Sequence, residues 1–289
     1  MPAGEACAAA GGAGGALAEG GAGAASPSAG GAGGAGTAAR HRPGGSGSGG
    51  SCPSPTEDCL TAADEDCGDD ANAGCGLILY LAFDEGAGAT AVDSSGRGND
   101  GTHSSTYVAG VRGTALSFDG SKGVVIDASP DLVWGADGEP FTVAFWLRVT
   151  GAPTTFWRGL IHKGNTDCGV GDRTTAMFLA PMAQVMHVAV SSASVVDPLL
   201  CYQYALNSGD VPVNQWVHVA SVVDGVEMRL YFDGVLNASV AADNVISNEA
   251  PVYIGHDPFY TGLVGEMDEL QIYDRALSEA DIGALLAPP

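Results

Sequence analysis

The sequence predicts an all-β protein, built as a sandwich or a barrel of many short strands. Three observations support this class: apolar and polar residues alternate in many short runs, Gly- and Asp-containing turns separate these runs, and a single segment has the pattern of a helix. The alternation begins at Gly76, and residues 76–289 are long enough to bury one sizeable core. We therefore predict one folded β domain over residues 76–289.

The individual strands follow from alternation and from turn residues. Residues 141–149 have an apolar side chain at every second position from Phe141 to Val149. Residues 215–223 and 227–232 flank Asp224-Gly225, a pair that suits a tight hairpin turn with positive φ. The other predicted strands are, in chain order, 77–83, 115–118, 124–127, 159–162, 177–179, 185–190, 252–255 and 263–273. The one predicted helix is 278–286, with Ser278 as its N-cap and with Glu279 and Asp281 in its first turn.

The N-terminal segment, residues 1–50, has a different composition. Of its 50 residues 34 are Gly or Ala, and it contains no aromatic residue. Such a chain cannot bury enough apolar surface to offset its conformational entropy, so we predict a disordered tether.

Residues 51–75 contain four of the seven cysteines among many acidic residues. Their spacing lacks the close Cys pairs that zinc sites favour, so we predict a disulfide-stapled segment rather than a zinc site. Four cysteines allow three pairings, and the spacing does not choose between them. The predicted disulfide cysteines are Cys52, Cys59, Cys67 and Cys75 in this segment, and Cys168 and Cys201 in the β domain, with Cys7 left over.

Disulfides indicate an oxidising compartment, and we expect an extracellular or cell-surface location. The residues after Met1 lack the basic start and the apolar stretch of a signal peptide, and no apolar run is long enough to span a membrane. One hypothesis reconciles these observations: the true start lies upstream, and Cys7 is the lipid-anchored residue of a bacterial lipoprotein.

The charge of the chain excludes two classes of partner. Lys and Arg number 11 against 34 Asp and Glu, which gives a net charge of −23. A nucleic-acid-binding protein needs clustered positive charge to neutralise phosphates, and an anionic membrane surface attracts basic segments. We therefore expect neither partner.

Seven short motifs follow one another along the β domain. The loop 93–101 reads D-S-S-G-R-G-N-D-G, and the others lie at 81–88, 113–120, 141–146, 215–220, 230–234 and 265–278. Their order resembles the laminin-G-like, concanavalin A-like jelly-roll family of bacterial secreted and surface proteins. The resemblance covers residues 76–287 and implies a two-sheet antiparallel jelly-roll β-sandwich of roughly a dozen strands.

The resemblance also implies a metal. Relatives of this fold hold Ca²⁺ between a loop such as 93–101 and the C-terminal strand, which would contribute Asp268 or Glu269. The predicted ligands are Asp93, Asn99 and Asp268. Carboxylate, amide and backbone oxygens are the donors that Ca²⁺ prefers. The alternative is that Asp93 and Asn99 accept hydrogen bonds from turn amides, as such residues commonly do.

The motif Glu266-Met267-Asp268-Glu269 is similar to the E-x-D-x-E strand of jelly-roll glucanases. On a strand, Glu266 and Asp268 share a face, whereas Leu270 stands where a third carboxylate is needed and Glu269 points the other way. Because no other nucleophile motif occurs, we predict that the protein is not an enzyme.

Three segments depart most from the family pattern, 157–158, 165–173 and 256–260. They contain Trp157, Phe259 and Tyr260, which we predict to bind ligand by stacking on sugar rings; the alternative is that these aromatics are simply buried. The predicted function is a non-catalytic module that binds a glycan or a surface protein, with Ca²⁺ as a candidate cofactor. The alternatives are a passive structural surface protein and a degenerate glycoside hydrolase.

Overall fold

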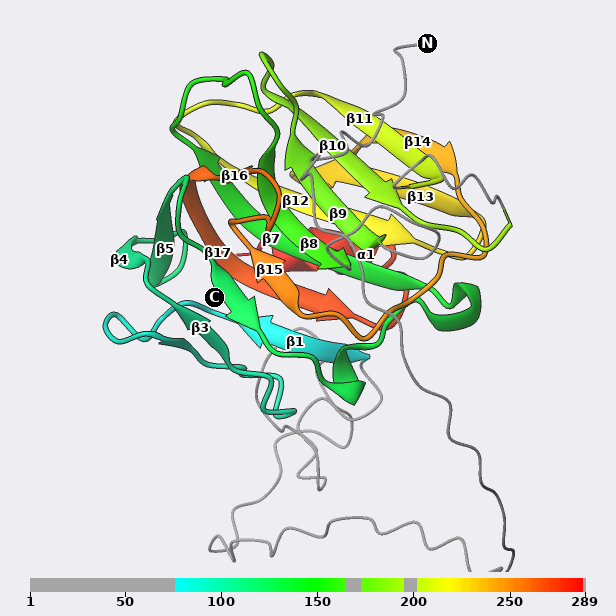
Figure 1. Ribbon diagram of the computed structural model, residues 1–289, viewed down its shortest axis with the longest axis horizontal. Coiled ribbons are helices and arrows are strands. Elements are labelled where there is room, and N and C mark those ends of the chain that lie inside the picture. Colours follow the sequence, from blue (N-terminus) through cyan, green and yellow to red (C-terminus); the bar gives the residue numbers. More distant parts are fainter. Residues whose placement is uncertain (1–75, 165–172, 195–201, 288–289) are drawn as a thin grey trace, which may run out of the picture. The chain divides into compact units, whose positions relative to one another are not determined.

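The computed structural model describes residues 76–164, 173–194 and 202–287. In this part of the chain almost all of the strands pair antiparallel, and they form two sheets that pack face to face (Figure 1). The predicted two-sheet jelly-roll sandwich is confirmed.

Sheet A consists of β1 (Leu77–Leu81), β4 (Thr106–Ala109), β5 (Thr114–Asp119), β7 (Phe141–Val149), β12 (Trp216–Val223), β13 (Glu227–Phe232), β14 (Val235–Ala241) and β17 (Val264–Tyr273). Its strand order is β14-β13-β12-β7-β17-β5-β4, and β1 pairs with the C-terminal half of β17. The termini of the β domain therefore lie side by side in one sheet.

Sheet B consists of β2 (Thr90–Ala91), β3 (Gly101–His103), β6 (Val124–Ile126), β8 (Arg158–Gly164), β9 (Arg173–Leu179), β10 (Val185–Val190), β11 (Tyr204–Asp210), β15 (Val252–Ile254) and β16 (Thr261–Gly262). Its order is β11-β10-β9-β8-β15-β6-β3-β2, and the short β16 pairs in parallel with the start of β8. Two single-turn 3-10 helices, η1 (Pro130–Leu132) and η2 (Ala136–Gly138), precede β7.

The core lies between the sheets and follows from the alternation within each strand. Phe141, Phe145 and Val149 of β7 face inward and are fully buried, as are Met177 and Met186 of sheet B. Burying one such side chain contributes about 1.5–3 kcal/mol relative to leaving it in water. The core residues of each strand fix which residues point outward, and the outward residues are the ones available for function.

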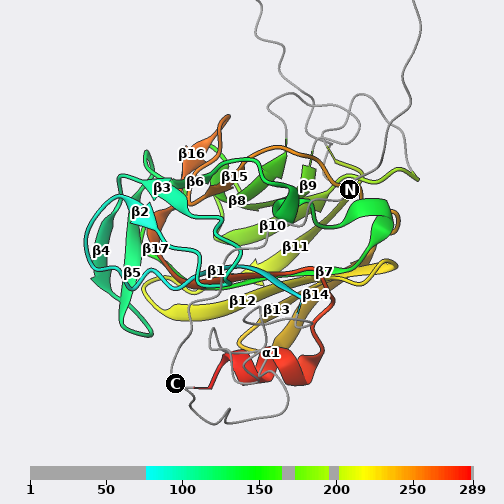
Figure 2. The same ribbon diagram turned by 90° about the horizontal axis from the view of Figure 1, so that it is seen from below.

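The single helix, α1 (Glu279–Leu285), covers part of the outer face of sheet A (Figure 2). Ser278 Oγ accepts from the Asp281 amide at 3.1 Å, and the Asp281 carboxylate accepts from the Ser278 amide at 2.9 Å. This reciprocal capping box satisfies two amides at the start of the helix. Ile282 and Leu285 are buried against outward-facing residues of sheet A, including Ala220. The predicted helix and its N-cap are confirmed.

The central strands match the prediction, and the unpredicted strands lie mainly at the edges. β7, β10 and β13 have the predicted bounds, and the other predicted strands appear with shifted ends. The strands that the sequence did not predict are β2, β3, β4, β11, β14 and β16. Of these, β4, β14, β11 and β2 stand at the ends of the two strand orders, and β16 also pairs with one strand only. Edge strands are covered less completely than central ones, so their sequences need not alternate.

The predicted tether (1–50), the predicted disulfide segment (51–75) and all seven cysteines lie outside the described residues. The disulfide predictions therefore stay predictions. Within the described residues, no helix has the length and apolar character needed to cross a membrane.

Candidate ligand-binding face

Sheet B carries a group of aromatic and histidine side chains on the side that faces away from the core. Ile161, Met177 and Val188 point into the core from β8, β9 and β10. Their neighbours in the strands point the opposite way. The outward residues of this group are His162, Phe178, His187 and Tyr253, and Trp157, Tyr202, Phe259 and Tyr260 join them from the flanking loops. We call these eight residues the aromatic face.

The three predicted ligand residues meet on this face. The Trp157 ring lies 4.9 Å from the His187 ring and 5.8 Å from the Phe178 ring, measured between centroids. The Tyr260 ring lies 5.7 Å from the Phe178 ring and 6.4 Å from the ring of Phe259. Phe259 is 48 % exposed, and Trp157 and Tyr260 are half-buried. Two separate loops therefore place aromatic rings around one central residue, and the binding role of these rings stays a prediction.

Asp257 holds the loop that carries Phe259 and Tyr260. Its Oδ1 accepts from the amides of Phe259 at 2.7 Å and Tyr260 at 3.1 Å, and its Oδ2 lies 2.8 Å from Nδ1 of His162. Both side chains of the His162–Asp257 pair are completely buried. Burial alone raises the pKa of a carboxyl, but the His162 contact and the Phe259 amide hold the pKa of Asp257 below its usual value. Asp257 is therefore ionised and anchors the loop to the centre of β8.

Gly159 makes room for this loop. A Cβ atom at position 159 would lie 2.6 Å from the Cβ and 2.9 Å from the amide nitrogen of Asp257. These distances are shorter than carbon–carbon and carbon–nitrogen contacts permit, so only glycine allows the 256–260 loop to pack this closely on β8.

A buried arginine holds the loop that carries Trp157. The Arg158 guanidinium donates to the carbonyl of Ala183 at 2.7 Å and to Oε1 of Gln184 at 3.0 Å, and the residue is 1 % exposed. Burial lowers its pKa. Thr261 Oγ1 donates to the carbonyl of Trp157 at 3.0 Å and so links the two aromatic loops directly. The two loops are therefore parts of one connected arrangement.

The carboxylates of β17 lie on the other sheet and have structural partners. Glu266 pairs with Arg148 at 2.7 Å, and Asp268 Oδ2 accepts from the amides of Val111 at 2.7 Å and Arg112 at 3.0 Å. Glu269 accepts from Arg112 Nη1 at 2.8 Å. The fully buried Asp268 has its pKa raised to about 7, chiefly by burial.

The strand pattern placed Glu269 opposite to Asp268, and the structure corrects this. A β-bulge interrupts the pairing of β17 with β7 between Asp268 and Gln271, and Glu269 has a positive φ of 52°. Both Asp268 and Glu269 consequently contact Arg112, one through its amide and the other through its guanidinium. The bulge breaks the two-residue period on which the sequence argument depended.

The loop 93–101 uses its polar side chains internally. Asp93 Oδ1 accepts from the amides of Tyr80 at 3.0 Å and Ser95 at 2.9 Å, and Oδ2 accepts from the amide of Asn99 at 2.9 Å. The side-chain amide of Asn99 donates to the carbonyl of Ile78 at 3.4 Å. These contacts are the alternative that the sequence left open, in which both residues satisfy turn groups.

The predicted calcium ligands do not form one donor set. Among the described residues no hydrogen bond joins Asp268 to Asp93 or Asn99, and no group of three or more His, Cys, Asp or Glu side chains is placed to hold a metal ion. Because all three amide contacts of Asp93 use its carboxylate oxygens, the residues do not fit a calcium site as they stand. Calcium binding stays a prediction.

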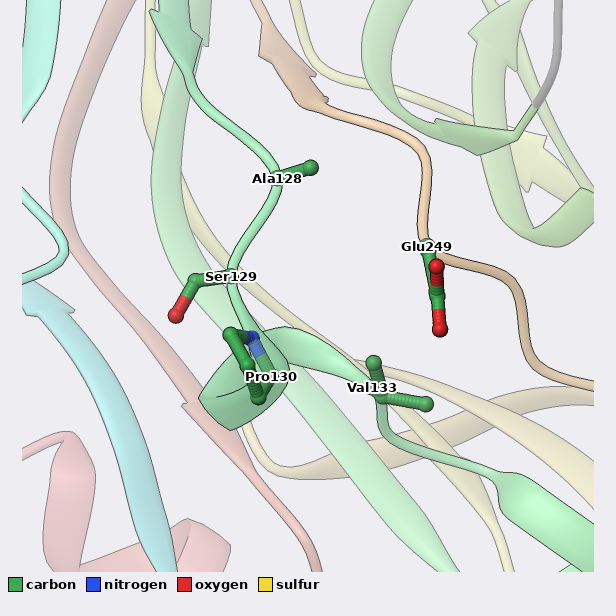
Figure 3. Close-up of a pocket in the computed structure, with 5 residues that line it drawn as sticks. All are labelled: Ala128, Ser129, Pro130, Val133 and Glu249. Atoms are coloured by element: carbon green, nitrogen blue, oxygen red, sulfur yellow. The ribbon is translucent and has the colours of Figure 1, made fainter. Parts of the chain in front are cut away.

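A cavity of about 280 Å³ lies beside the η1 turn (Figure 3). It is lined by Ala128, Ser129, Pro130, Val133 and Glu249, and none of the predicted ligand residues is among them. Glu249 also acts on the buried Lys163. Burial lowers the pKa of Lys163 to about 8, and the negative charge of Glu249 opposes part of this decrease. The lining offers one carboxylate and mostly apolar atoms, so the aromatic face is the better candidate site.

The sequence did not single out Phe178, Asp257 or His187 for ligand binding. The alternation along β9 separates Phe178 from Met177, but nothing local shows which of the two faces is covered. Asp257 lies in a segment that departs from the family pattern, and that departure was the available signal. His187 has the pattern of a structural histidine within a strand.

A family model described as the concanavalin A-like lectin/glucanases superfamily matches residues 118–283. The chain belongs to this superfamily. The match spans most of the two sheets, from the end of β5 into α1. No curated protein sequence matches the chain.

Solved structures share the superfamily fold. The binding domain of Paraclostridial mosquitocidal protein 1 superposes with a TM-score of 0.59 at 15 % identity, over 73 % of this chain and 52 % of that chain. Domain 4 of AbnA, an extracellular arabinanase from Geobacillus stearothermophilus, gives 0.52 at 21 % identity, over 73 % of this chain and 98 % of that one. Trypanosoma rangeli sialidase superposes with a TM-score of 0.53 at 16 % identity, over 73 % of this chain and 32 % of the sialidase chain. This chain thus spans about half of the toxin domain and a third of the sialidase, and the likeness shows the fold alone.

Proposed function

We propose that this domain is a non-catalytic, extracellular carbohydrate-recognition module whose ligand stacks on the aromatic face. The observation that carries the proposal is that Trp157 and Tyr260, from two loops, both contact Phe178, with Phe259 next to Tyr260. Partly exposed aromatic rings supply large rigid apolar area at low entropic cost, and their faces match the C–H faces of sugar rings.

The face also offers the polar groups that hydroxyls need. His187 Nδ1 lies 2.8 Å from Oδ1 of Asn207, so Nδ1 carries the hydrogen and Nε2 is an acceptor. Nε2 is buried and has no hydrogen-bond partner among the described residues. Burial and the charge of Arg173 hold the pKa of His187 below its usual value, so the imidazole is neutral at pH 7. A sugar hydroxyl that donates to Nε2 would satisfy it.

The carboxylates argue for binding without catalysis. Retaining hydrolysis needs two carboxyl groups about 5–5.5 Å apart that face one cleft. Glu266, Asp268 and Glu269 belong to sheet A and bind arginines and main-chain amides, whereas the aromatic rings belong to sheet B. Asp257 is bound to His162 and to two amides. These four carboxylates of the described part of the chain therefore favour recognition, because none of them is placed with another as an acid and nucleophile pair on the aromatic face.

The comparisons are consistent with such a role. The similar solved structures include the binding domain of a toxin and an arabinanase domain in complex with arabinotriose. The partner that we propose is a glycan, free or displayed on a surface. The proposal does not require Ca²⁺.

The test is binding of the full-length protein to a glycan array, with three single variants. We expect Trp157→Ala and Phe259→Ala to weaken binding by at least about tenfold, because each removes a stacking ring. Trp216→Ala is the matched control, since Trp216 is a half-buried tryptophan of sheet A that lies against Arg148. Loss of binding in all three variants, an absence of any glycan binding, or hydrolysis of a bound glycan overturns the proposal. Circular dichroism of each variant confirms that it is folded.

A further inference from the structure

Arg173 is a buried cation within the aromatic face. It is the first residue of β9 and is 3 % exposed. Its guanidinium carbon lies 5.4 Å from the ring centroid of Phe178 and 5.8 Å from that of Tyr202. Stacking on two rings places the guanidinium over the outward side of sheet B, where Phe178 lies. Cation–π contacts stabilise such an arrangement but leave the hydrogens in the guanidinium plane free to donate.

A row of small side chains crosses the outward side of sheet B and meets β9 between Arg173 and Phe178. The outward residue Ala176 of β9 is paired with Ala189 of β10, which in turn is paired with Ala205 of β11. His162 of β8 stands at the other end of this row, opposite Ala176. Three methyl groups in one row leave this part of the outward side without large side chains of its own.

The guanidinium has an unsatisfied donor. Nη1 of Arg173 is buried and has no hydrogen-bond partner among the described residues. The nearby carboxylate of Asp257 is already bound to His162 and to the amides of Phe259 and Tyr260. Arg173 lowers the pKa of Asp257 through its charge, but no hydrogen bond joins the two side chains. An arginine that is buried without an anionic partner costs free energy, which a bound anion would recover.

We propose that the ligand of the aromatic face is an acidic sugar, whose carboxylate binds the guanidinium of Arg173 and one of whose hydroxyls binds Nε2 of His187. This inference rests on the proposed carbohydrate-binding function and specifies its ligand class. The ring of Tyr202 lies next to both groups: its centroid is 5.8 Å from the guanidinium carbon of Arg173 and 5.4 Å from the ring centroid of His187. The two groups that we assign to the ligand therefore lie beside the same ring. A planar carboxylate fits the fork of a guanidinium.

The test compares matched acidic and neutral saccharides by isothermal titration of the full-length protein. The probes are tetragalacturonate and its methyl ester, sialyllactose and lactose, and a hyaluronan tetrasaccharide and its carboxyl-reduced form. We expect the acidic member of at least one pair to bind roughly 10- to 100-fold more tightly than its neutral counterpart, which is the range for a charge-assisted hydrogen bond. Added salt weakens the binding of the acidic member.

Variants separate Arg173 from the rest of the face. We expect Arg173→Gln to reduce the affinity for the acidic sugar to that of its neutral counterpart, and Arg173→Lys to retain part of the preference. Arg229→Gln is the matched control, because Arg229 belongs to sheet A and pairs with Asp224. The thermal midpoint of Arg173→Gln provides a second measurement: removing an unpaired buried charge should leave it unchanged or raise it.

Each outcome decides the question. If the neutral and acidic saccharides of every pair bind equally tightly, this inference is wrong and the carbohydrate-binding proposal still stands. The same holds if Arg173→Gln keeps the preference for the acidic saccharide. A lowered midpoint in Arg173→Gln shows that the arginine is satisfied within the protein and also overturns the inference. If no saccharide binds at all, the proposed function itself fails.

Discussion

Asp257 and His162 form a completely buried pair in which Oδ2 of the carboxylate lies 2.8 Å from Nδ1 of the imidazole. The same carboxylate accepts hydrogen bonds from the main-chain amides of Phe259 and Tyr260. One side chain thus connects the centre of β8 with the loop that presents two aromatic rings. Asp257 is a positioning residue, because it acts on the ligand through the rings that it holds.

Replacing Asp257 tests this role. In Asp257→Ala the two loop amides lose their acceptor and His162 loses the carboxylate beside it, and each buried group left without a partner costs about 1–3 kcal/mol. We expect the free energy of unfolding to fall by about 2–4 kcal/mol and glycan affinity to fall with it. Urea denaturation measures the first quantity, and titration of the folded variant measures the second. The control is Asp119→Asn, a change at an exposed turn residue, and equal losses in both variants would contradict the assignment.

Lys163 predicts an unusual rise of stability at alkaline pH. Its side chain is fully buried, donates to the carbonyl of Ala250 and lies 5.4 Å from the ring centroid of Trp134. Burial lowers its pKa from 10.5 to about 8. Between these two values the unfolded chain binds the proton that the folded protein has released, so stability rises with pH.

We expect the free energy of unfolding to increase by about 2 kcal/mol between pH 7.5 and pH 10 through this group. The chain has two lysines, and Lys122 is exposed beside Asp119, so the comparison is internal. Lys163→Met should abolish the increase and Lys122→Met should keep it, as followed by urea denaturation at each pH. If the free energy of unfolding of Lys163→Met still increases with pH as in the wild type, another group causes the increase.

The burial of Asp268 leads us to expect the opposite pH dependence of stability, at lower pH. Burial raises the pKa of its carboxyl from 3.8 to about 7, so between these values the folded protein binds the proton that the unfolded chain has lost. Stability through this group therefore falls as pH rises, by about 2–3 kcal/mol between pH 5 and pH 8. Asp268→Asn cannot ionise, and its side-chain oxygen can still accept from Val111 and Arg112. We expect this variant to be more stable than the wild type at pH 8 and close to it at pH 5; a less stable variant at pH 8 would show that the ionised form is required.

Replacing Asp93 by Asn should destabilise the protein, in contrast to Asp268→Asn. Its two carboxylate oxygens accept from three main-chain amides, and hydrogen bonds to a charged acceptor contribute about 1.5–3 kcal/mol each before compensation. We expect Asp93→Asn to lower the thermal midpoint at pH 7. Because these contacts occupy the carboxylate, we also expect excess chelator to leave the wild-type midpoint unchanged. A midpoint that falls in EDTA and recovers with Ca²⁺ would restore the calcium site that the sequence predicted.

Local patterns explain which elements could be predicted from the sequence. The strand 141–149 and the hairpin around Asp224-Gly225 were predicted because alternation and turn residues are properties of neighbouring residues. Ser278 was predicted as an N-cap for the same reason, since it directly precedes a helical segment with Glu279 and Asp281 in its first turn. The edge strand β14 was not predicted, because most of its side chains are exposed and none is fully buried.

The candidate site was predictable only in part. Trp157, Phe259 and Tyr260 could be selected as aromatics in segments that depart from the family pattern. The structure places Trp157 and Tyr260 against Phe178, and Phe259 against Tyr260. The unpaired donor of Arg173 and the buried acceptor of His187 could not be recognised, because hydrogen-bond satisfaction depends on every neighbouring atom. Glu269 was placed on the wrong side, because a β-bulge depends on the partner strand as well as on the strand itself.

The amino-acid sequence by itself determined the all-β class, the central strands, the capped helix and the superfamily, since these depend on local periodicity and on the order of short motifs. The tertiary structure decided which loops meet: it joined Thr261 to Trp157 and Asp257 to His162. Such contacts depend on the register of strands that are far apart in the chain. A change of register by one residue turns every side chain of a strand to the opposite face, so the chemistry of the outer face of sheet B is a property of the pairing.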